Sequence, residues 1–139
     1  MTEAPVIVDT GPLVAFLVRD DAHHRWSADR FRELPAPFLS CEAVLTEAFH
    51  LVRRMPGGTV RLFELLETGS IRVAFDLMDE RRPLSRLMDK YADVPMSLAD
   101  ACVVRMAERV ERASVLTLDR HFTLYRKHGR QPIPAIMPS

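Results

Sequence analysis

Short apolar strands alternate with amphipathic helices along the chain, and this alternation constrains the fold more than any other feature. Five stretches have the pattern of strands: PVIVD from Pro5, PFLS from Pro37, SIRVAF from Ser70, SVLTLD from Ser114 and PAIM from Pro134. Strands that alternate with helices form a parallel sheet with helices on both faces. The sequence therefore predicts a doubly wound α/β/α sandwich around a central parallel sheet of about five strands.

The segments between the strands have the apolar spacing of helices. One helix is expected to begin near Pro12, and others are predicted at residues 23–34, 41–54, 59–67, 83–91 and 97–112. We expect Ser40 to cap the helix at 41–54. The apolar face predicted for that helix consists of Val44, Leu45, Ala48, Leu51 and Val52.

Length and charge limit the kinds of protein this can be. The chain has 139 residues, which suits one domain spanning residues 1–139. Nineteen Lys and Arg balance nineteen Asp and Glu, so any surface for nucleic acid must be local. No stretch approaches the ~18 apolar residues of a membrane span, which favours a cytoplasmic protein. The two cysteines, Cys41 and Cys102, are expected to be buried free thiols.

Four acidic residues are the candidates for chemistry. Asp9 directly follows the first strand, and Asp119 lies at the end of the fourth. Glu47 and Asp100 lie on predicted helices, beside their apolar stripes. In doubly wound sheets, ligands bind outside the carboxyl ends of the strands, where the strand order reverses. The two strand-end acids are therefore expected to face the ligand site.

Each acid also has an ordinary structural explanation. Asp9 could cap the following helix, and Asp100 could form a capping box with Ser97. Glu47 could be a surface residue, and Asp119 could belong to a turn. If all four converge, however, their mutual repulsion requires protons or cations. Oxygen ligands without His or Cys favour Mg²⁺ or Mn²⁺, the ions that commonly support phosphodiester hydrolysis.

Four segments together resemble the PIN-domain ribonucleases, and among these the VapC-type toxins of toxin–antitoxin pairs. The segments are VIVDTGPLVAFL, SCEAVLTEAFHLV, YADVPMSLADACVVRMAE and VLTLDRHFTLYR, and the resemblance extends from about Val6 to Met137. It implies a metal-dependent endoribonuclease that uses Mg²⁺ or Mn²⁺ and forms a homodimer. RNA would be its substrate and a cognate antitoxin its partner.

The resemblance also implies a role for individual residues. The metal-binding acids would be Asp9, Glu47, Asp100 and Asp119. Polar residues beside them, which would orient water or the acids, are Thr10, Ser97 and Thr117.

Two other functions remain open on the sequence. The chain could be a catalytically inactive module that binds nucleic acid or an antitoxin. It could also be a phosphatase with Asp9 as nucleophile, although haloacid-dehalogenase-type phosphatases have a second acid two residues on, where this chain has Gly11. No glycine-rich phosphate-binding loop is present, which argues against a nucleotide cofactor.

Two surfaces are further candidates for binding. The basic stretch 120–130 follows Asp119 and is a candidate for contacts with phosphate. Within it, Phe122 and Tyr125 are expected to pack in the core rather than stack on bases. Trp26 and Phe31 could offer an exposed apolar face to an antitoxin.

Overall fold

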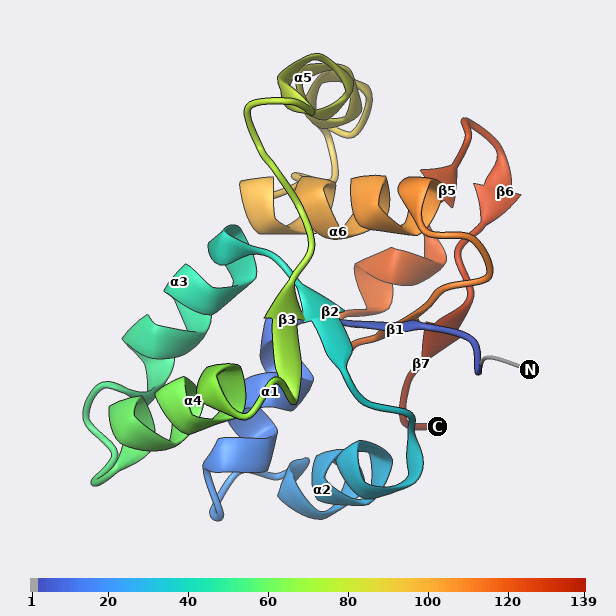
Figure 1. Ribbon diagram of the computed structural model, residues 1–139. Helices are drawn as coiled ribbons and strands as arrows, with labels where there is room; N and C mark the ends of the chain where they lie inside the picture. Colours follow the sequence, from blue (N-terminus) through green and yellow to red (C-terminus); the bar gives the residue numbers. More distant parts are fainter. Residues whose placement is uncertain (1–2) are drawn as a thin grey trace.

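A parallel five-stranded sheet forms the centre of the protein in the computed structural model, which describes residues 3–139 (Figure 1). The strands lie in the order β3-β2-β1-β4-β7. Their bounds are β1 Val6–Val8, β2 Phe38–Ser40, β3 Ile71–Val73, β4 Ser114–Leu116 and β7 Ala135–Ile136. The predicted α/β fold and the number of strands in its sheet are confirmed.

Six α-helices surround this sheet within the described residues. Their bounds are α1 Thr10–Leu17, α2 His24–Glu33, α3 Glu42–Val52, α4 Gly58–Glu67, α5 Arg81–Lys90 and α6 Leu98–Arg109. Figure 1 shows α5 and α6 above the sheet and α1, α2 and α4 below it. A 3₁₀ helix, η1 (Arg120–Thr123), follows β4. None of the helices in residues 3–139 is long and apolar enough to cross a membrane.

β1 occupies the middle of the sheet because its three residues are apolar and fully enclosed. Val6, Ile7 and Val8 are at most 3% exposed, as expected for a strand covered on both faces. β1 pairs with β4 from Val6–Ser114 to Val8–Leu116, and with β2 at Ile7–Leu39. The strand order reverses between β1 and β4, so the crevice expected at a switch point lies at the carboxyl ends of these two strands.

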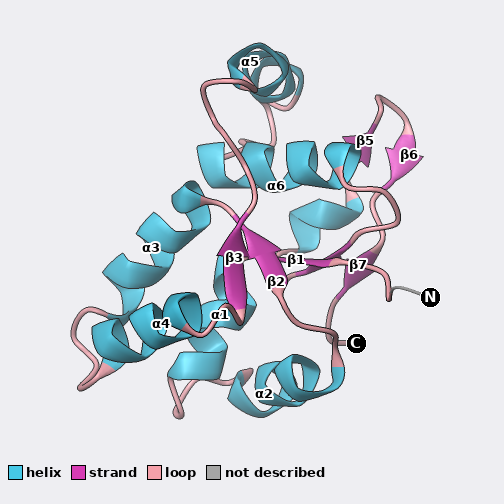
Figure 2. Cartoon of the chain, in the orientation of Figure 1, coloured by secondary structure: helices cyan, strands magenta, loops and turns pink. Residues whose placement is uncertain are grey.

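A short antiparallel hairpin was not predicted. It consists of β5 (Arg126–Lys127) and β6 (Gln131–Pro132), and Figure 2 shows it beside the end of α6. Its turn contains His128 and Gly129 with φ angles of 52° and 84°. The sequence signal was weak because each strand has only two residues and no apolar alternation.

Several local predictions were wrong. Ser40 does not cap α3; Cys41 takes that position, and Ser40 Oγ donates to the Val8 carbonyl at 3.1 Å. The last predicted helix ends at Arg109, because Val110 is extended and Arg112 has a φ of 60°.

The expected exposed face on α2 is also wrong. Phe31 packs between Phe16 and Phe38, with both ring centroids 4.6 Å away. Trp26 is partly buried against the core. Leu51, predicted to be buried on α3, is instead 58% exposed. It lies at the rim of the α3 stripe, where no other element covers it fully.

The fold predicts different costs for the same substitution at two leucines. Leu62 on α4 is 0% exposed, whereas Leu51 is 58% exposed. We expect Leu62→Ala to lower the free energy of unfolding by about 2–5 kcal/mol, since it leaves a cavity. Leu51→Ala should change it by no more than about 0.5 kcal/mol. Urea unfolding followed by circular dichroism measures both, and equal losses would contradict this assignment of the core.

Candidate active site

The candidate site is built around Asp9, the residue that follows β1. Its backbone N–H donates to the Leu116 carbonyl at 3.0 Å, so the pairing of β1 with β4 extends to Asp9. The residue is 6% exposed. It is the N-cap residue of α1, but its side chain makes no capping hydrogen bond. The ordinary capping explanation therefore does not account for this carboxylate.

Thr117 connects Asp9 to the segment that follows β4. Its hydroxyl is buried and donates to Asp9 Oδ2 at 2.7 Å, and the Thr117 hydroxyl oxygen accepts the Asp119 N–H at 2.9 Å. Asp119 Oδ1 in turn accepts the His121 N–H at 2.9 Å, which starts η1. The Thr117 hydroxyl thus fixes the ends of β1 and β4 relative to each other.

Asp100 enters the site from the first turn of α6. With Ser97 it forms the predicted capping box: Ser97 Oγ accepts the Asp100 N–H at 3.0 Å, and Asp100 Oδ2 accepts the Ser97 N–H at 3.3 Å. The Tyr125 hydroxyl donates to the same carboxylate oxygen at 3.1 Å. The capping explanation is therefore correct for Asp100, and a second donor also holds its carboxylate.

The sequence did not reveal the contact between Tyr125 and Asp100. As expected it lies in the core, where it is 0% exposed and makes edge-on contacts with Tyr91 and Phe122. Burial first, and then the charge of Asp100, raise the pKa of its hydroxyl, which stays protonated and donates. No sequence spacing signals this contact, because 25 residues separate it from Asp100.

Glu47 lies on an exposed part of α3 and reaches the site through α1. Its Oε2 accepts the Thr10 hydroxyl at 3.1 Å, and Thr10 directly follows Asp9. Hydrogen bonds and chain neighbours therefore join the four acids and the three polar residues predicted beside them into two linked groups. One group contains Asp9, Thr10, Glu47, Thr117 and Asp119, and the other contains Asp100 with Ser97 and Tyr125.

The two groups lie near enough for their carboxylates to repel one another. The pKa of the Asp9 carboxyl is raised to about 6, mainly by burial; hydrogen bonds from Thr117 and the Thr10 backbone oppose the rise, and the charges of Asp100 and Asp119 contribute to it. Among residues 3–139, no Lys or Arg forms a salt bridge with Asp9, Glu47, Asp100 or Asp119. Within the same residues, their only such contact is between His121 Nδ1 and Asp119 Oδ1 at 3.3 Å. Negative charge therefore accumulates here without a Lys or Arg partner to balance it.

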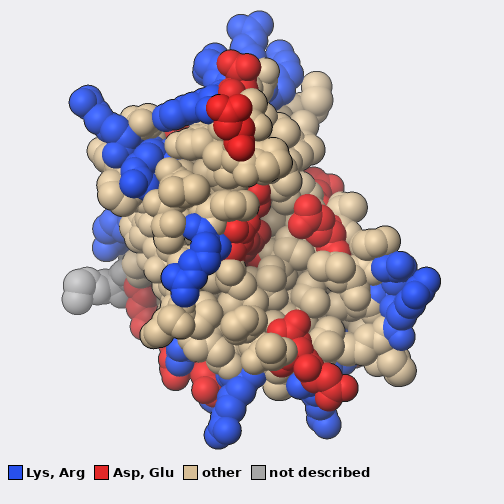
Figure 3. All heavy atoms as spheres, turned by 180° about the vertical axis from the view of Figure 1, so that it is seen from behind, with Lys and Arg blue, Asp and Glu red and all other residues tan. Residues whose placement is uncertain are grey.

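These residues fit a hard divalent cation. All are oxygen donors, and within the described residues the buried Asp9 carboxylate has no cationic partner. The described part of the chain contains no group of three or more acidic, His or Cys side chains already arranged to hold a metal ion. Mg²⁺ commonly binds through one or two carboxylates and keeps several waters. The site therefore suits an ion that keeps part of its water shell better than an ion whose ligands all come from the protein. The view from behind shows acidic side chains in a central hollow, with many Lys and Arg side chains at the periphery (Figure 3).

Other residues that can bind metals or stack on bases lie outside the hydrogen-bonded groups of the site. His24 Nδ1 lies 2.8 Å from the Ala15 carbonyl, and His50 is exposed on α3. Cys41 and Cys102 are buried free thiols, as expected. Phe122 packs in the core and is 1% exposed.

The PIN domain family matches residues 6–127 of the chain. The chain belongs to the PIN-domain family. It is 28% identical over 127 residues to Ribonuclease VapC26 of Mycobacterium tuberculosis, an alignment that covers 89% of this chain and 94% of that protein. Its fold is similar to that of VapC20 of Mycobacterium tuberculosis, described as a toxin that cleaves the sarcin–ricin loop. That crystal structure matches with a TM-score of 0.74 and 19% identity, over 91% of this chain and 99% of the other.

The raised pKa of Asp9 predicts how stability depends on pH in the absence of metal. An acid with a higher pKa in the folded state than in the unfolded chain destabilises the fold as it ionises. From pH 4 to pH 8, the ionised carboxylate should therefore lower the free energy of unfolding, by about 2–3 kcal/mol for a shift from 3.8 to about 6. Asp9→Asn removes this loss, so the variant should be more stable than the wild type at pH 8.

Urea unfolding in EDTA at several pH values measures this difference. The advantage of Asp9→Asn should shrink as the pH falls toward 4. An advantage that is constant across this range, or absent at pH 8, would contradict the pKa shift.

Proposed function

We propose that this protein is an Mg²⁺- or Mn²⁺-dependent endoribonuclease and the toxin of a toxin–antitoxin pair. The observation that carries the proposal is the buried Asp9 carboxylate at the sheet's switch point, near Asp100 and Asp119 and without a cationic partner in the described residues. Its relative VapC26 is named a ribonuclease, and VapC20 is described as an RNA-cleaving toxin. An RNA-cleaving toxin would act in the cytoplasm.

The proposed mechanism assigns a task to each side chain of the site. Asp9, Glu47, Asp100 and Asp119 would hold the metal directly or through water. When bound, the metal would activate water and stabilise charge on the leaving oxygen. Thr117 orients Asp9 and Tyr125 orients Asp100, through the hydrogen bonds described above. Thr10 does the same for Glu47.

A histidine base is not required in this scheme. His121 contacts Asp119, but it is 47% exposed and lies at the outer end of the chain of contacts. Since a divalent ion lowers the pKa of its bound water, the carboxylates can carry the chemistry.

Removing the charge of Asp9 should abolish most of the activity. We expect Asp9→Asn to cut single-stranded RNA at least ~100-fold more slowly, a loss of about 2.7 kcal/mol of transition-state stabilisation. The matched control is Asp89→Asn, an exposed aspartate on α5 outside the site. Cleavage is measured with Mg²⁺ or Mn²⁺, with and without EDTA.

EDTA should stop the wild type, and Asp89→Asn should cut at the wild-type rate. Cleavage that persists in EDTA, or at full rate in Asp9→Asn, would refute the metal-nuclease proposal. A chain that binds RNA without cutting it would instead be the inactive binding module.

Thr117 allows a test of how the acids are positioned, because its hydroxyl makes hydrogen bonds with both Asp9 and Asp119. Thr117→Val keeps the shape but removes the donor to Asp9 and the acceptor for Asp119 N–H. We expect RNA cleavage to fall by roughly 10–100-fold, about 1.4–2.7 kcal/mol. Thr117→Ser keeps the hydroxyl and should retain most of the rate. Equal rates in all three proteins would show that this link does not position the site.

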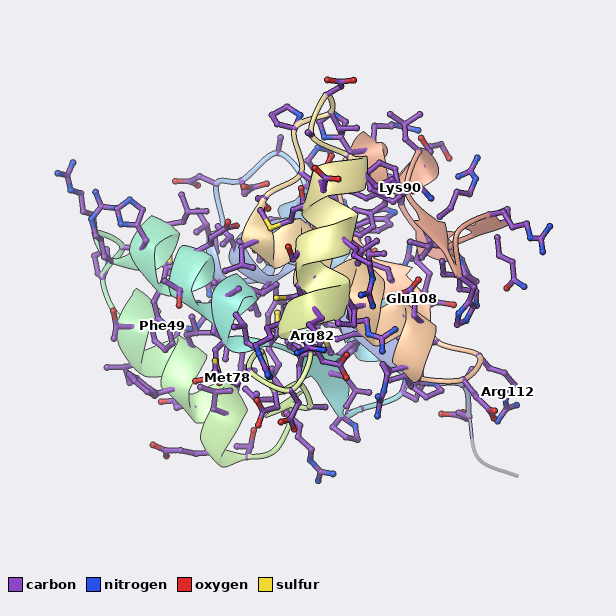
Figure 4. All side chains as sticks on the ribbon, turned by 90° about the horizontal axis from the view of Figure 1, so that it is seen from above. Phe49, Met78, Arg82, Lys90, Glu108 and Arg112 are labelled. Atoms are coloured by element: carbon purple, nitrogen blue, oxygen red, sulfur yellow. The ribbon has the colours of Figure 1, made fainter. Side chains whose placement is uncertain are left out.

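The proposed partners are a second copy of the chain and a small antitoxin. Besides the relatives, α3 and α4 support this, because Leu51, Val60 and Phe63 are 50–61% exposed there. The Phe63 ring lies 4.7 Å from Phe49, the residue labelled beside these helices in Figure 4. Light scattering at micromolar concentration should show a dimer. Expression without the antitoxin should arrest growth of the host, and Asp9→Asn should relieve the arrest.

A further inference from the structure

A pocket of about 390 Å³ lies between α5, α6 and the β5–β6 hairpin, away from the carboxylate site. Its charged lining consists of Arg86, Lys90, Arg105, Arg126 and Glu108. Figure 4 shows Lys90 at the end of α5 and Glu108 on the neighbouring α6. Four permanent cations thus face one carboxylate in a chain whose overall charge is zero.

The one carboxylate in the pocket lining, that of Glu108, already has hydrogen-bond partners within the protein. Glu108 Oε1 accepts Arg105 Nη1 at 3.2 Å, and its Oε2 accepts the His128 N–H at 2.7 Å. Arg105 is also paired with Glu80, at 2.7 Å from Nε to Oε2. Arg109 Nη1 also lies 3.2 Å from Glu80 Oε1, so the two arginines, Arg105 and Arg109, balance Glu80 and Glu108. The other three cations of the pocket remain uncompensated.

Those three cations, Arg86, Lys90 and Arg126, form no salt bridge with any carboxylate in residues 3–139. Lys90 Nζ donates to the Gly129 carbonyl at 3.0 Å. Arg126 Nη1 donates to the Thr123 and Tyr125 carbonyls at 2.8 and 3.1 Å. Carbonyls orient these side chains but carry no net charge, so the pocket retains about three positive charges and suits an anion.

Two residues that are neighbours in the chain, Tyr125 and Arg126, connect the pocket to the carboxylate site. Tyr125 donates to Asp100, and the next residue, Arg126, lines the pocket. The Arg126 N–H also donates to the Tyr91 hydroxyl at 2.9 Å, which fixes the hairpin beside the end of α5. The same short segment of chain therefore lies beside both the pocket and the Asp100 carboxylate.

We propose that this pocket binds a backbone phosphate of the RNA, at a position away from the bond that is cut. The inference rests on the proposed ribonuclease function. Arginine forks and a lysine ammonium match phosphate oxygens, and the link through Tyr125 favours an anion on the same polymer as the reacting phosphate. The basic stretch 120–130 contributes to this pocket through Arg126 and His128.

The test is RNA binding by the full chain in EDTA, where no metal-dependent cleavage occurs. Arg86→Gln/Lys90→Gln removes two exposed cations of the pocket. Its affinity for a labelled single-stranded RNA should fall about 10-fold at low salt. The slope of log K against log salt should become shallower by about 0.7 for each phosphate that the variant no longer neutralises.

Arg82→Gln is the matched control. Arg82 is exposed on the same helix, at the end opposite Lys90, and does not line the pocket (Figure 4). It should bind RNA with the wild-type affinity and salt slope. Circular dichroism verifies that all variants are folded.

Equal affinity and slope in the double variant, or no RNA binding by the wild type, would overturn the inference. So would loss of binding to poly-glutamate with unchanged binding to RNA, since the pocket would then recognise an acidic protein. Cleavage with Mg²⁺ or Mn²⁺ is measured separately. RNA binding through the pocket without any cleavage would refute the proposed nuclease alone, and cleavage with unchanged binding in the double variant would refute the pocket alone.

Discussion

The hydrogen bond from Thr117 to Asp9 is the interaction on which the site depends most. It joins the ends of the two strands between which the strand order reverses, at 2.7 Å and away from solvent. A buried carboxylate needs such donors because desolvation disfavours its charge. Here the donors do not compensate fully, and the pKa of Asp9 stays raised to about 6. The fold therefore maintains an acid that would be more stable with a cation beside it.

Two helices supply Glu47 and Asp100, and Asp100 also stabilises the start of its own helix. Asp100 caps the N-terminus of α6 with Ser97 and still directs its carboxylate to the Tyr125 hydroxyl. A carboxylate in the first turn of a helix is also stabilised by the helix dipole. One residue can thus serve the fold and the site, so a structural role for Asp100 does not argue against a functional one.

The sequence predicted the elements whose burial pattern is strong. Val6–Val8 had to be a central strand because it is apolar throughout, and a capping box with a regular apolar stripe indicated the helix of Asp100. It did not predict contacts made across long separations, such as Tyr125 with Asp100. Nor did it predict the burial of Phe31 between Phe16 and Phe38, because apolar spacing shows that a residue has an apolar neighbour but not which one.

The distribution of charge explains how a neutral chain could act on a polyanion. Carboxylates that attract a cation also repel phosphate, and at physiological ionic strength this repulsion extends about 8 Å. A bound divalent ion can offset it at the reacting phosphate but not along the rest of the RNA. Uncompensated cations such as Arg86 and Lys90 on α5 would supply attraction at a second place, in a pocket whose lining contains none of these carboxylates. In the proposed function, this separation of positive and negative charge would let the protein bind the RNA backbone at one point and present another phosphate to the acids.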